Sequence, residues 1–136
     1  MQEYSVALCT YNGAKYIKEQ LDSIIQQTIK PSQIVISDDG SKDNTLKIAE
    51  NILSNSGLDY IIVNNTVKHG VTSNFQNAFS YCTSPIIFCS DQDDVWVKHK
   101  AERMLLEYDK HPEAMLVFSD GELVDEHLNT LGCNVW

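Results

Sequence analysis

The chain has 136 residues, enough for one domain with a hydrophobic core but too few for two of ordinary size. Ten Lys and Arg against nineteen Asp and Glu give a net charge of −9, with no basic stripe, which argues against a nucleic-acid groove. An acidic protein still binds a nucleotide when a divalent cation bridges the two anions. Because no apolar run reaches the length of a membrane span and the N-terminus lacks a signal-peptide pattern, we expect a cytoplasmic protein.

Short β-rich runs alternate with amphipathic helical stretches along the chain. In chain order the patterns predict a strand at residues 4–10, a helix at 14–28, a strand at 33–37, a helix at 44–57, a strand at 60–65, a helix at 74–82, a strand at 85–90, a helix at 95–111 and a strand at 114–120. Continuously apolar strands of this kind are typical of a parallel sheet covered by helices on both faces. We therefore expect one α/β domain over residues 1–136, with a Rossmann-like, mostly parallel sheet. Because no helix follows the last strand, we expect this domain to be incomplete at its C-terminus, as the N-terminal part of a longer chain.

Polar residues follow every predicted strand, at the positions where an open parallel sheet binds its ligands. In chain order these runs are "CTYNG", "SDDGSKDNT", "NNTVKHGVTSN", "SDQDD" and "SDGE". Three of the five contain Asp, and the carboxyl ends of parallel strands meet at one edge of the sheet. The sequence therefore predicts a shared acidic cleft at that edge.

Two acids, Asp38 and Asp39, end the second strand and allow two interpretations. In the first they belong to a turn, because Asp and Gly favour a sharp bend and Ser41 or Asp43 can cap the helix that follows. In the second they bind a base or a sugar, because a carboxylate accepts two hydrogen bonds side by side. We assign the turn chemistry to Ser41 and Asp43 and the binding to Asp38 and Asp39.

Asp91 and Asp93 follow the fourth strand at positions i and i+2. If the backbone stays extended there, both carboxylates point to the same side and can hold one hard cation, with diphosphate oxygens completing an octahedron. Asp94 would then point elsewhere and cap the helix that follows. The alternative is a solvated acidic turn, because an Asp-x-Asp pair is common by chance.

The motifs of several other chemistries are absent from the sequence. It contains no GxxxxGK[ST] phosphate loop, no GxGxxG and no GxSxG nucleophile elbow. The run "ISDDGS" is superficially similar to the aspartyl-phosphate motif of haloacid-dehalogenase-like phosphatases, but Ser37 stands at the position of the nucleophile. A receiver domain has a similar length and layout, but it needs its acidic pair after the first strand, where this sequence has "CTYNG".

Five blocks in a fixed order resemble the N-terminal half of a family 2 glycosyltransferase with the GT-A fold. The blocks are "VALCTYNGAKYIKEQLDSIIQQT", "IVISDDGSKDNT", "GVTSNFQNAF", "IIFCSDQDDVWVKHKAERM" and "LVFSDGELVD". The "DQDDVW" run is similar to bacterial rhamnosyltransferase-like enzymes of surface-polysaccharide assembly. The resemblance implies transfer of a sugar from a nucleotide diphosphate donor to an acceptor hydroxyl, with inversion at the anomeric carbon and with Mg²⁺ or Mn²⁺ as the cofactor.

The resemblance also implies which residues contact the nucleotide base. Thr10 and Tyr11 resemble the segment that packs around the base of the donor. Asp39, with Asp38 beside it, matches the acid that hydrogen-bonds the base. We therefore expect these four residues at the nucleotide end of the site.

The same resemblance assigns the rest of the donor site. The "HGVTSN" block matches a loop near the nucleotide, where His69 or Asn74 would touch the donor. Asp91 and Asp93 match the Asp-x-Asp element that lies against the ribose and holds the divalent cation on the diphosphate. The implied acceptor is a glycan or a lipid-linked glycan, which would bring the enzyme to the inner face of the membrane as a peripheral protein.

We nominate no catalytic base, because the family's base lies in a segment with no match before Trp136. Asp120 is the only late acid at a strand end, and we interpret it as structural. Two alternatives to a transferase therefore stay open. The first is a nucleotide-binding module without catalysis, and the second is a receiver-like domain with an acidic pocket.

Overall fold

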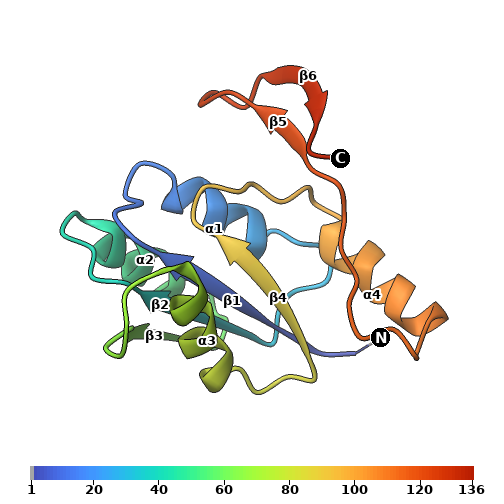
Figure 1. Cartoon of the computed structure of the whole chain (residues 1–136), viewed down its shortest axis with the longest axis horizontal. Helices are drawn as coiled ribbons and strands as arrows, with labels where there is room; N and C mark the ends of the chain where they lie inside the picture. The colour runs from blue at the N-terminus through green and yellow to red at the C-terminus, as the bar shows by residue number, and fades with distance from the viewer. Residues whose placement is uncertain (1) are drawn as a thin grey trace.

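The computed structural model describes residues 2–136 and contains a four-stranded parallel sheet with helices packed on it (Figure 1). The four strands are β1 (Tyr4–Thr10), β2 (Gln33–Asp38), β3 (Tyr60–Asn64) and β4 (Ile86–Asp91). Their order across the sheet is β3-β2-β1-β4, and every neighbouring pair is parallel. β1 lies inside the sheet and is buried along its whole length, as its continuous apolar run predicts.

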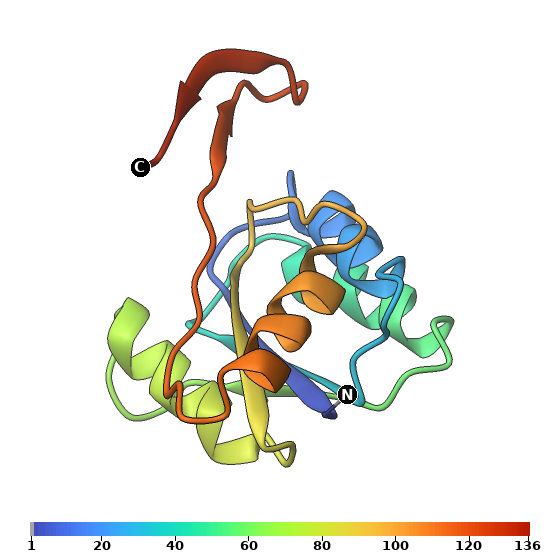
Figure 2. The same ribbon diagram turned by 90° about the vertical axis from the view of Figure 1, so that its right-hand side faces the viewer.

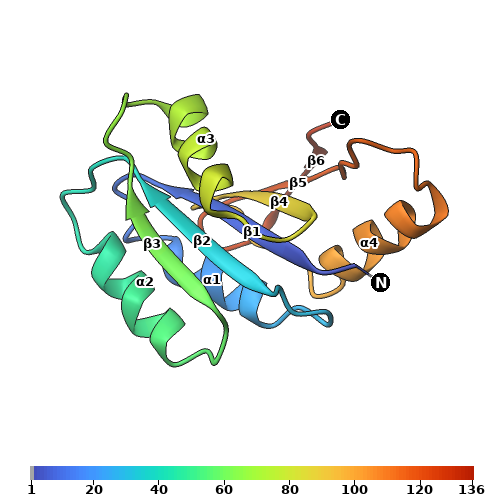
Figure 3. The same ribbon diagram turned by 90° about the horizontal axis from the view of Figure 1, so that it is seen from below.

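Helices cover both faces of the sheet (Figure 3). They are α1 (Ile17–Ile25), α2 (Thr45–Ser54), α3 (Val71–Tyr81) and α4 (Lys100–Lys110). α1, α2 and α4 contribute to the larger hydrophobic core, whereas α3 packs on the opposite face over the small residues Ala7, Cys9 and Val35. The α/β class and the parallel sheet with helices on both faces, as predicted from the sequence, are confirmed. No helix in residues 2–136 has the length and hydropathy needed to cross a membrane.

The register of the strands brings their carboxyl ends together at one edge of the sheet. Thr10 at the end of β1 pairs with Asp38 of β2, and Cys9 pairs with Asp91 at the end of β4. The backbone N–H of Asp39 donates to the carbonyl oxygen of Thr10 at 3.0 Å, which extends this alignment beyond the strand. The polar runs after β1, β2 and β4 therefore meet, as the order of the sequence motifs predicts.

The helix predicted from residue 95 begins later, at Lys100, and the residue at its N-cap is His99. The prediction that Asp94 caps this helix is therefore wrong. The physical reason is Trp96, which is buried at 5% exposure and packs its ring 5.6 Å from that of Phe88. Its backbone N–H also donates to Ser23 Oγ at 3.0 Å, so the segment before α4 is held against α1 and the sheet.

The fifth strand predicted at 114–120 is also wrong, because this segment is irregular and pairs with no strand within the described residues. It runs past β4 (Figure 2). A cavity of about 280 Å³ is lined by Ile86–Cys89, by Leu116–Ser119 and by residues of α4. The chain then forms a separate antiparallel pair, β5 (Glu122–Val124) and β6 (Thr130–Asn134). The apolar pattern of 114–120 is real, but a strand forms only where a neighbouring strand takes up its hydrogen bonds.

Candidate functional site

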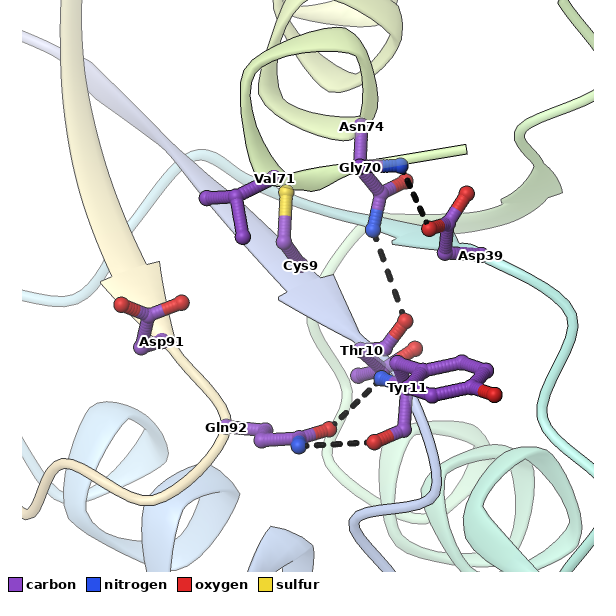
Figure 4. Close-up of a pocket in the computed structure, with 9 residues that line it drawn as sticks. All are labelled: Cys9, Thr10, Tyr11, Asp39, Gly70, Val71, Asn74, Asp91 and Gln92. Carbon is purple, nitrogen blue, oxygen red and sulfur yellow. Dashed lines mark hydrogen bonds between the residues drawn. The ribbon is translucent and has the colours of Figure 1, made fainter. Parts of the chain in front are cut away.

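A cavity of about 260 Å³ opens at the carboxyl edge of the sheet (Figure 4). The ends of β1 and β4, the turn after β2 and the first turns of α3 form its walls. The lining residues are Cys9, Thr10, Tyr11, Asp39, Gly70, Val71, Asn74, Asp91 and Gln92. The structure thus brings together five of the predicted site residues, namely Thr10, Tyr11, Asp39, Asn74 and Asp91.

The wall formed by β1 combines a buried polar residue with an exposed ring. Thr10 is buried, and its hydroxyl donates to Asp38 Oδ1 at 2.6 Å. Tyr11 follows it at the cavity mouth with 55% of its surface exposed. Asn74 reaches in from α3, where its amide donates to the Thr10 carbonyl oxygen at 3.4 Å and accepts the Ser37 hydroxyl at 2.6 Å. Asn74 thereby fixes the start of α3 against β1 and β2.

Asp39 is surrounded by hydrogen-bond donors from the loop before α3. Its Oδ2 accepts the backbone N–H of Gly70 at 2.9 Å, and its Oδ1 accepts the Asn65 amide at 2.9 Å and lies 3.1 Å from His69 Nδ1. Burial by itself raises the pKa of Asp39, but the hydrogen bonds from Gly70, Asn65 and His69 outweigh it and set that pKa below its usual value. Asp39 is therefore a preformed carboxylate. His69 contacts this carboxylate from the outside and is not part of the cavity lining.

Asp38 lies apart from the cavity, although the sequence places it beside Asp39. It is buried at 1% exposure and accepts hydrogen bonds from the Thr10 and Ser41 hydroxyls and from the backbone N–H groups of Gly40 and Ser41. Gly40 has φ 95°, a left-handed conformation that glycine adopts without strain. The turn after β2 thus occupies both oxygens of Asp38.

The loops that follow β1 and β2 are tied to each other. The backbone N–H of Asn12 donates to Ser41 Oγ at 2.9 Å, and that of Gly13 donates to Thr45 Oγ1 at 2.8 Å. Asp43 accepts the backbone N–H of Thr45, the first residue of α2, at 3.0 Å. Ser41 and Asp43 therefore serve the turn and the helix start, which leaves Asp39 as the acid of this run that faces the cavity.

The acidic run after β4 is a turn, so the extended backbone on which a shared orientation of Asp91 and Asp93 depended is not present. The backbone N–H of Asp94 points back to the carbonyl oxygen of Asp91 at 3.4 Å, so the chain reverses over Gln92 and Asp93. Because of this turn, Asp91 lines the cavity and Asp93 does not. Gln92 makes two hydrogen bonds to the main chain of Tyr11, which explains its place in the cavity wall.

The electrostatics at Asp91 differ from those at Asp39. Burial raises the pKa of Asp91, and the charges of Asp94 and Asp93 raise it further. Burial and Asp93 also raise the pKa of Asp94, although the nearby Lys100 acts in the opposite direction. Within residues 2–136, no three His, Cys, Asp or Glu side chains meet as a complete metal site. Asp91 fits a hard cation as one carboxylate ligand, because a cation would relieve the repulsion from its acidic neighbours.

Sequence reasoning missed four lining residues, Cys9, Gly70, Val71 and Gln92. Gly70 had a signal in the sequence, because a glycine in a loop marks a possible position of positive φ. In the structure it has φ 126°, and its N–H donates to Asp39. Val71 lies on the first turn of α3, which begins there rather than at residue 74. Gln92 carried no signal, because its role depends on a loop 81 residues away in the sequence.

The fold and the cavity define a class of protein: a Rossmann-like α/β domain with a cavity at the carboxyl ends of its parallel strands, where open sheets of this kind bind ligands. Within that class, the chain belongs to glycosyl transferase family 2, whose family model matches residues 5–123. The family resemblance found in the sequence motifs is thereby confirmed.

Two relatives illustrate this membership. The dTDP-rhamnosyl transferase RfbG of Shigella flexneri is 38% identical over 102 residues, which cover 72% of this chain and 35% of the relative. An uncharacterized glycosyltransferase of Nostoc sp., alr2836, is 33% identical over 101 residues, which cover 74% of this chain and 31% of the relative. The match thus spans about a third of the length of these relatives.

Two solved structures with the same fold are complexes with nucleotide sugars. S. aureus TarS in complex with UDP-GlcNAc aligns with a TM-score of 0.73 and 28% identity, covering 81% of this chain and 32% of TarS. The mannosyltransferase PcManGT from Pyrobaculum calidifontis, in complex with GDP-Man and Mn²⁺, aligns with a TM-score of 0.68 and 25% identity. The latter alignment covers 90% of this chain and 35% of PcManGT. These likenesses confirm the GT-A type fold.

Proposed function

We propose that this chain binds the nucleotide diphosphate part of a sugar donor, in an enzyme that transfers the sugar to an acceptor hydroxyl. One observation carries the proposal: the acid implied for the base, Asp39, and the first acid of the Asp-x-Asp element, Asp91, line one cavity. Asp39 directly follows β2 and Asp91 ends β4, and the register of the sheet brings the two together. The nucleotide sugars named for TarS and PcManGT support the same class of ligand.

Asp39 and Tyr11 suit the nucleotide base. An ionised carboxylate only accepts hydrogen bonds, so Asp39 favours a base that offers a ring N–H, as uracil, thymine and guanine do. The exposed ring of Tyr11 offers an aromatic surface at the cavity mouth on which a base can stack. Thr10 and Asn74 complete this end of the proposed site, and Asp38 supports it through its hydrogen bond with Thr10.

Asp91 suits the diphosphate, with Mg²⁺ or Mn²⁺ between them. A hard cation would take Asp91 as one oxygen ligand and complete its coordination with diphosphate oxygens and water. We include Asp93 as a ligand through water, because its side chain is outside the cavity lining. When bound, such a cation stabilises the negative charge that develops on the departing nucleotide diphosphate. The Mn²⁺ named for PcManGT supports this cofactor.

The proposed transfer inverts the anomeric carbon, and its general base is not assigned. Asp120 accepts the backbone N–H groups of Gly121 and Trp136 and the amide of Asn134, so it stabilises the β5–β6 segment. This arrangement supports its structural interpretation. We propose a glycan or lipid-linked glycan as the acceptor, in surface-polysaccharide synthesis in the cytoplasm or at the inner face of the membrane. The likeness to a dTDP-rhamnosyl transferase supports that setting.

Calorimetry with UDP, GDP and dTDP in the presence of Mn²⁺ tests the proposal. We expect at least one nucleotide to bind, and we expect chelation of the metal to abolish binding. Asp91→Asn should weaken metal-dependent binding by at least about tenfold, because it removes a charged ligand from the cation. It should not lower the melting temperature, because the carboxylate is repelled by Asp93 and Asp94.

Asp109→Asn is the matched control, because Asp109 is an exposed acid on α4, outside the cavity lining. Its binding should equal that of the wild type. Absence of binding for all three nucleotides would contradict the proposal. Equal binding with and without metal would contradict its cofactor.

A further inference from the structure

We propose that Gln92 is a positioning residue of the donor site, which clamps the main chain of Tyr11 and so fixes the width of the cavity. This inference rests on the proposed function and adds a role for a residue between the two acids of the Asp-x-Asp element. It is carried by the hydrogen bonds of Gln92 and by the space that Gly13 leaves for it.

The clamp consists of two hydrogen bonds to one residue. Gln92 Oε1 accepts the backbone N–H of Tyr11 at 2.7 Å, and Gln92 Nε2 donates to the carbonyl oxygen of Tyr11 at 2.9 Å (Figure 4). A carboxamide offers the same donor and acceptor as a peptide group. The β1–β4 ladder ends at the pair Cys9 and Asp91, and the Gln92 side chain continues it by linking the next segments of both chains.

Gly13 provides the room for this side chain. A methyl group added at Gly13 would overlap the carboxamide of Gln92, and its three nearest heavy atoms would all belong to that side chain. Gly13 does not have a positive φ, so the backbone conformation does not demand glycine there. The glycine of the "CTYNG" run is therefore explained by the packing of Gln92.

The clamp joins the two walls on which the donor would rest. Tyr11 belongs to the wall proposed for the base, and Gln92 directly follows Asp91 on the wall proposed for the diphosphate. A nucleoside diphosphate must reach both walls at once, so a loop already held at the right spacing loses less conformational freedom on binding. Glu at position 92 could not donate to the Tyr11 carbonyl and would add a further negative charge beside Asp91 and Asp93.

The first test measures, without any ligand, whether the hydrogen bonds of Gln92 protect the Tyr11 amide. Amide hydrogen exchange of Tyr11, measured by NMR on the 136-residue chain, should be slow in the wild type. It should become at least about tenfold faster in Gln92→Leu, which keeps the side-chain bulk but removes the acceptor. Gly13→Ala should have the same effect, because its methyl group displaces the Gln92 carboxamide, the flexible end of a side chain. Unchanged exchange in both variants would overturn the proposal.

The second test reads nucleotide affinity with Mn²⁺. Gln92→Leu and Gly13→Ala should each weaken binding by about tenfold, and the double variant should bind no more weakly than either, because both changes open the same clamp. Additive losses, or an unchanged affinity in variants whose Tyr11 amide is released, would overturn the positioning role. Gln26→Leu, at an exposed glutamine after α1, is the matched control and should leave both readouts unchanged.

The two tests separate this inference from the proposed function. If the wild type binds nucleotide but Gln92→Leu binds it equally well, only the positioning role fails. If the wild type binds none of the nucleotides, the proposed function fails and takes the positioning role with it, while exchange at Tyr11 still shows whether the clamp exists. Circular dichroism of each variant, compared with Gln26→Leu, shows whether a loss of binding comes from unfolding.

Discussion

Asp39 and Asp91 line the same cavity, but their surroundings shift their pKa values in opposite directions. Hydrogen bonds from Gly70, Asn65 and His69 lower the pKa of Asp39 against the effect of burial, so this carboxylate is stabilised by the protein itself. Burial and the charges of Asp94 and Asp93 raise the pKa of Asp91, so the protein around it disfavours its ionised form. The surroundings of Asp39 thus favour the ionised carboxylate, whereas those of Asp91 oppose it.

At the scale of the residue, Asp39 should make the free energy of unfolding depend on pH. A carboxyl whose pKa is lowered by folding adds stability above its unfolded pKa of about 4, and that contribution is lost as the pH falls through the folded value. Asp39→Asn should therefore be less stable than the wild type at neutral pH. The difference should shrink as the pH falls below about 4, because Asp39 is then protonated first in the unfolded chain and, at lower pH, in the folded protein as well. Urea unfolding at a series of pH values measures it.

The control for this prediction is Asp109→Asn. Asp109 is exposed on α4, and its replacement should change the unfolding midpoint little at any pH. A difference between wild type and Asp39→Asn that stays constant over the whole pH range would contradict the assignment of a lowered pKa to Asp39.

At the scale of the element, prediction from sequence succeeded where the apolar pattern has a packing partner in the chain. β1 and the strands beside it were predicted correctly, because each is covered by helices or paired with neighbours. The apolar pattern of 95–111 predicted a helix from residue 95, whereas α4 begins at Lys100. The difference comes from the packing of Trp96 against Phe88, a tertiary contact that local periodicity does not show. The segment 114–120 has a strand pattern but pairs with no strand within the described residues.

The candidate site was predictable to the extent that it depends on strand order. Asp39 and Asp91 were predicted from their positions after β2 and β4, because parallel strands end at a common edge. The turn over Gln92 and Asp93 was not predictable from their spacing, since an i, i+2 pair faces one way only if the backbone is extended. The fit of Gln92 over Gly13 depends on two distant loops, which no local pattern describes.

The buried ring of Trp96 should stabilise the segment that leads into α4. Trp96→Ala should lower the free energy of unfolding by about 3 kcal/mol or more, because it removes a large side chain packed against Phe88. Trp96→Phe should cost less, since an aromatic ring remains. The chain's other tryptophan, Trp136, is 80% exposed, so Trp136→Ala should change stability little and serves as the control. Equal losses for Trp96→Ala and Trp136→Ala in urea unfolding would contradict the anchoring of the segment before α4.

At the scale of the whole molecule, apolar surface is concentrated beside the outer edge of β4. Met115 is 97% exposed, Leu116 74% and Phe118 72%, and the ring of Phe118 lies 6.2 Å from that of Trp136. β4 pairs only with β1 among the described strands, so its other edge presents free backbone donors and acceptors. An apolar run next to an open sheet edge is a surface that favours contact with another chain.

We therefore expect copies of this chain to associate through the surface formed by 115–118 and the β4 edge. The net charge of −9 opposes that contact, and salt screens the repulsion, so association should increase when NaCl rises from about 0.05 to about 0.5 M. Sedimentation velocity at several protein concentrations measures it. Phe118→Lys should shift the equilibrium towards monomer by about tenfold, because it places a charge in the contact. Val67→Lys makes the same kind of change at an apolar residue that is 87% exposed in the loop before α3, and it should have little effect. A chain that stays monomeric at high salt, or an equal response to both substitutions, would show that this surface does not hold copies together.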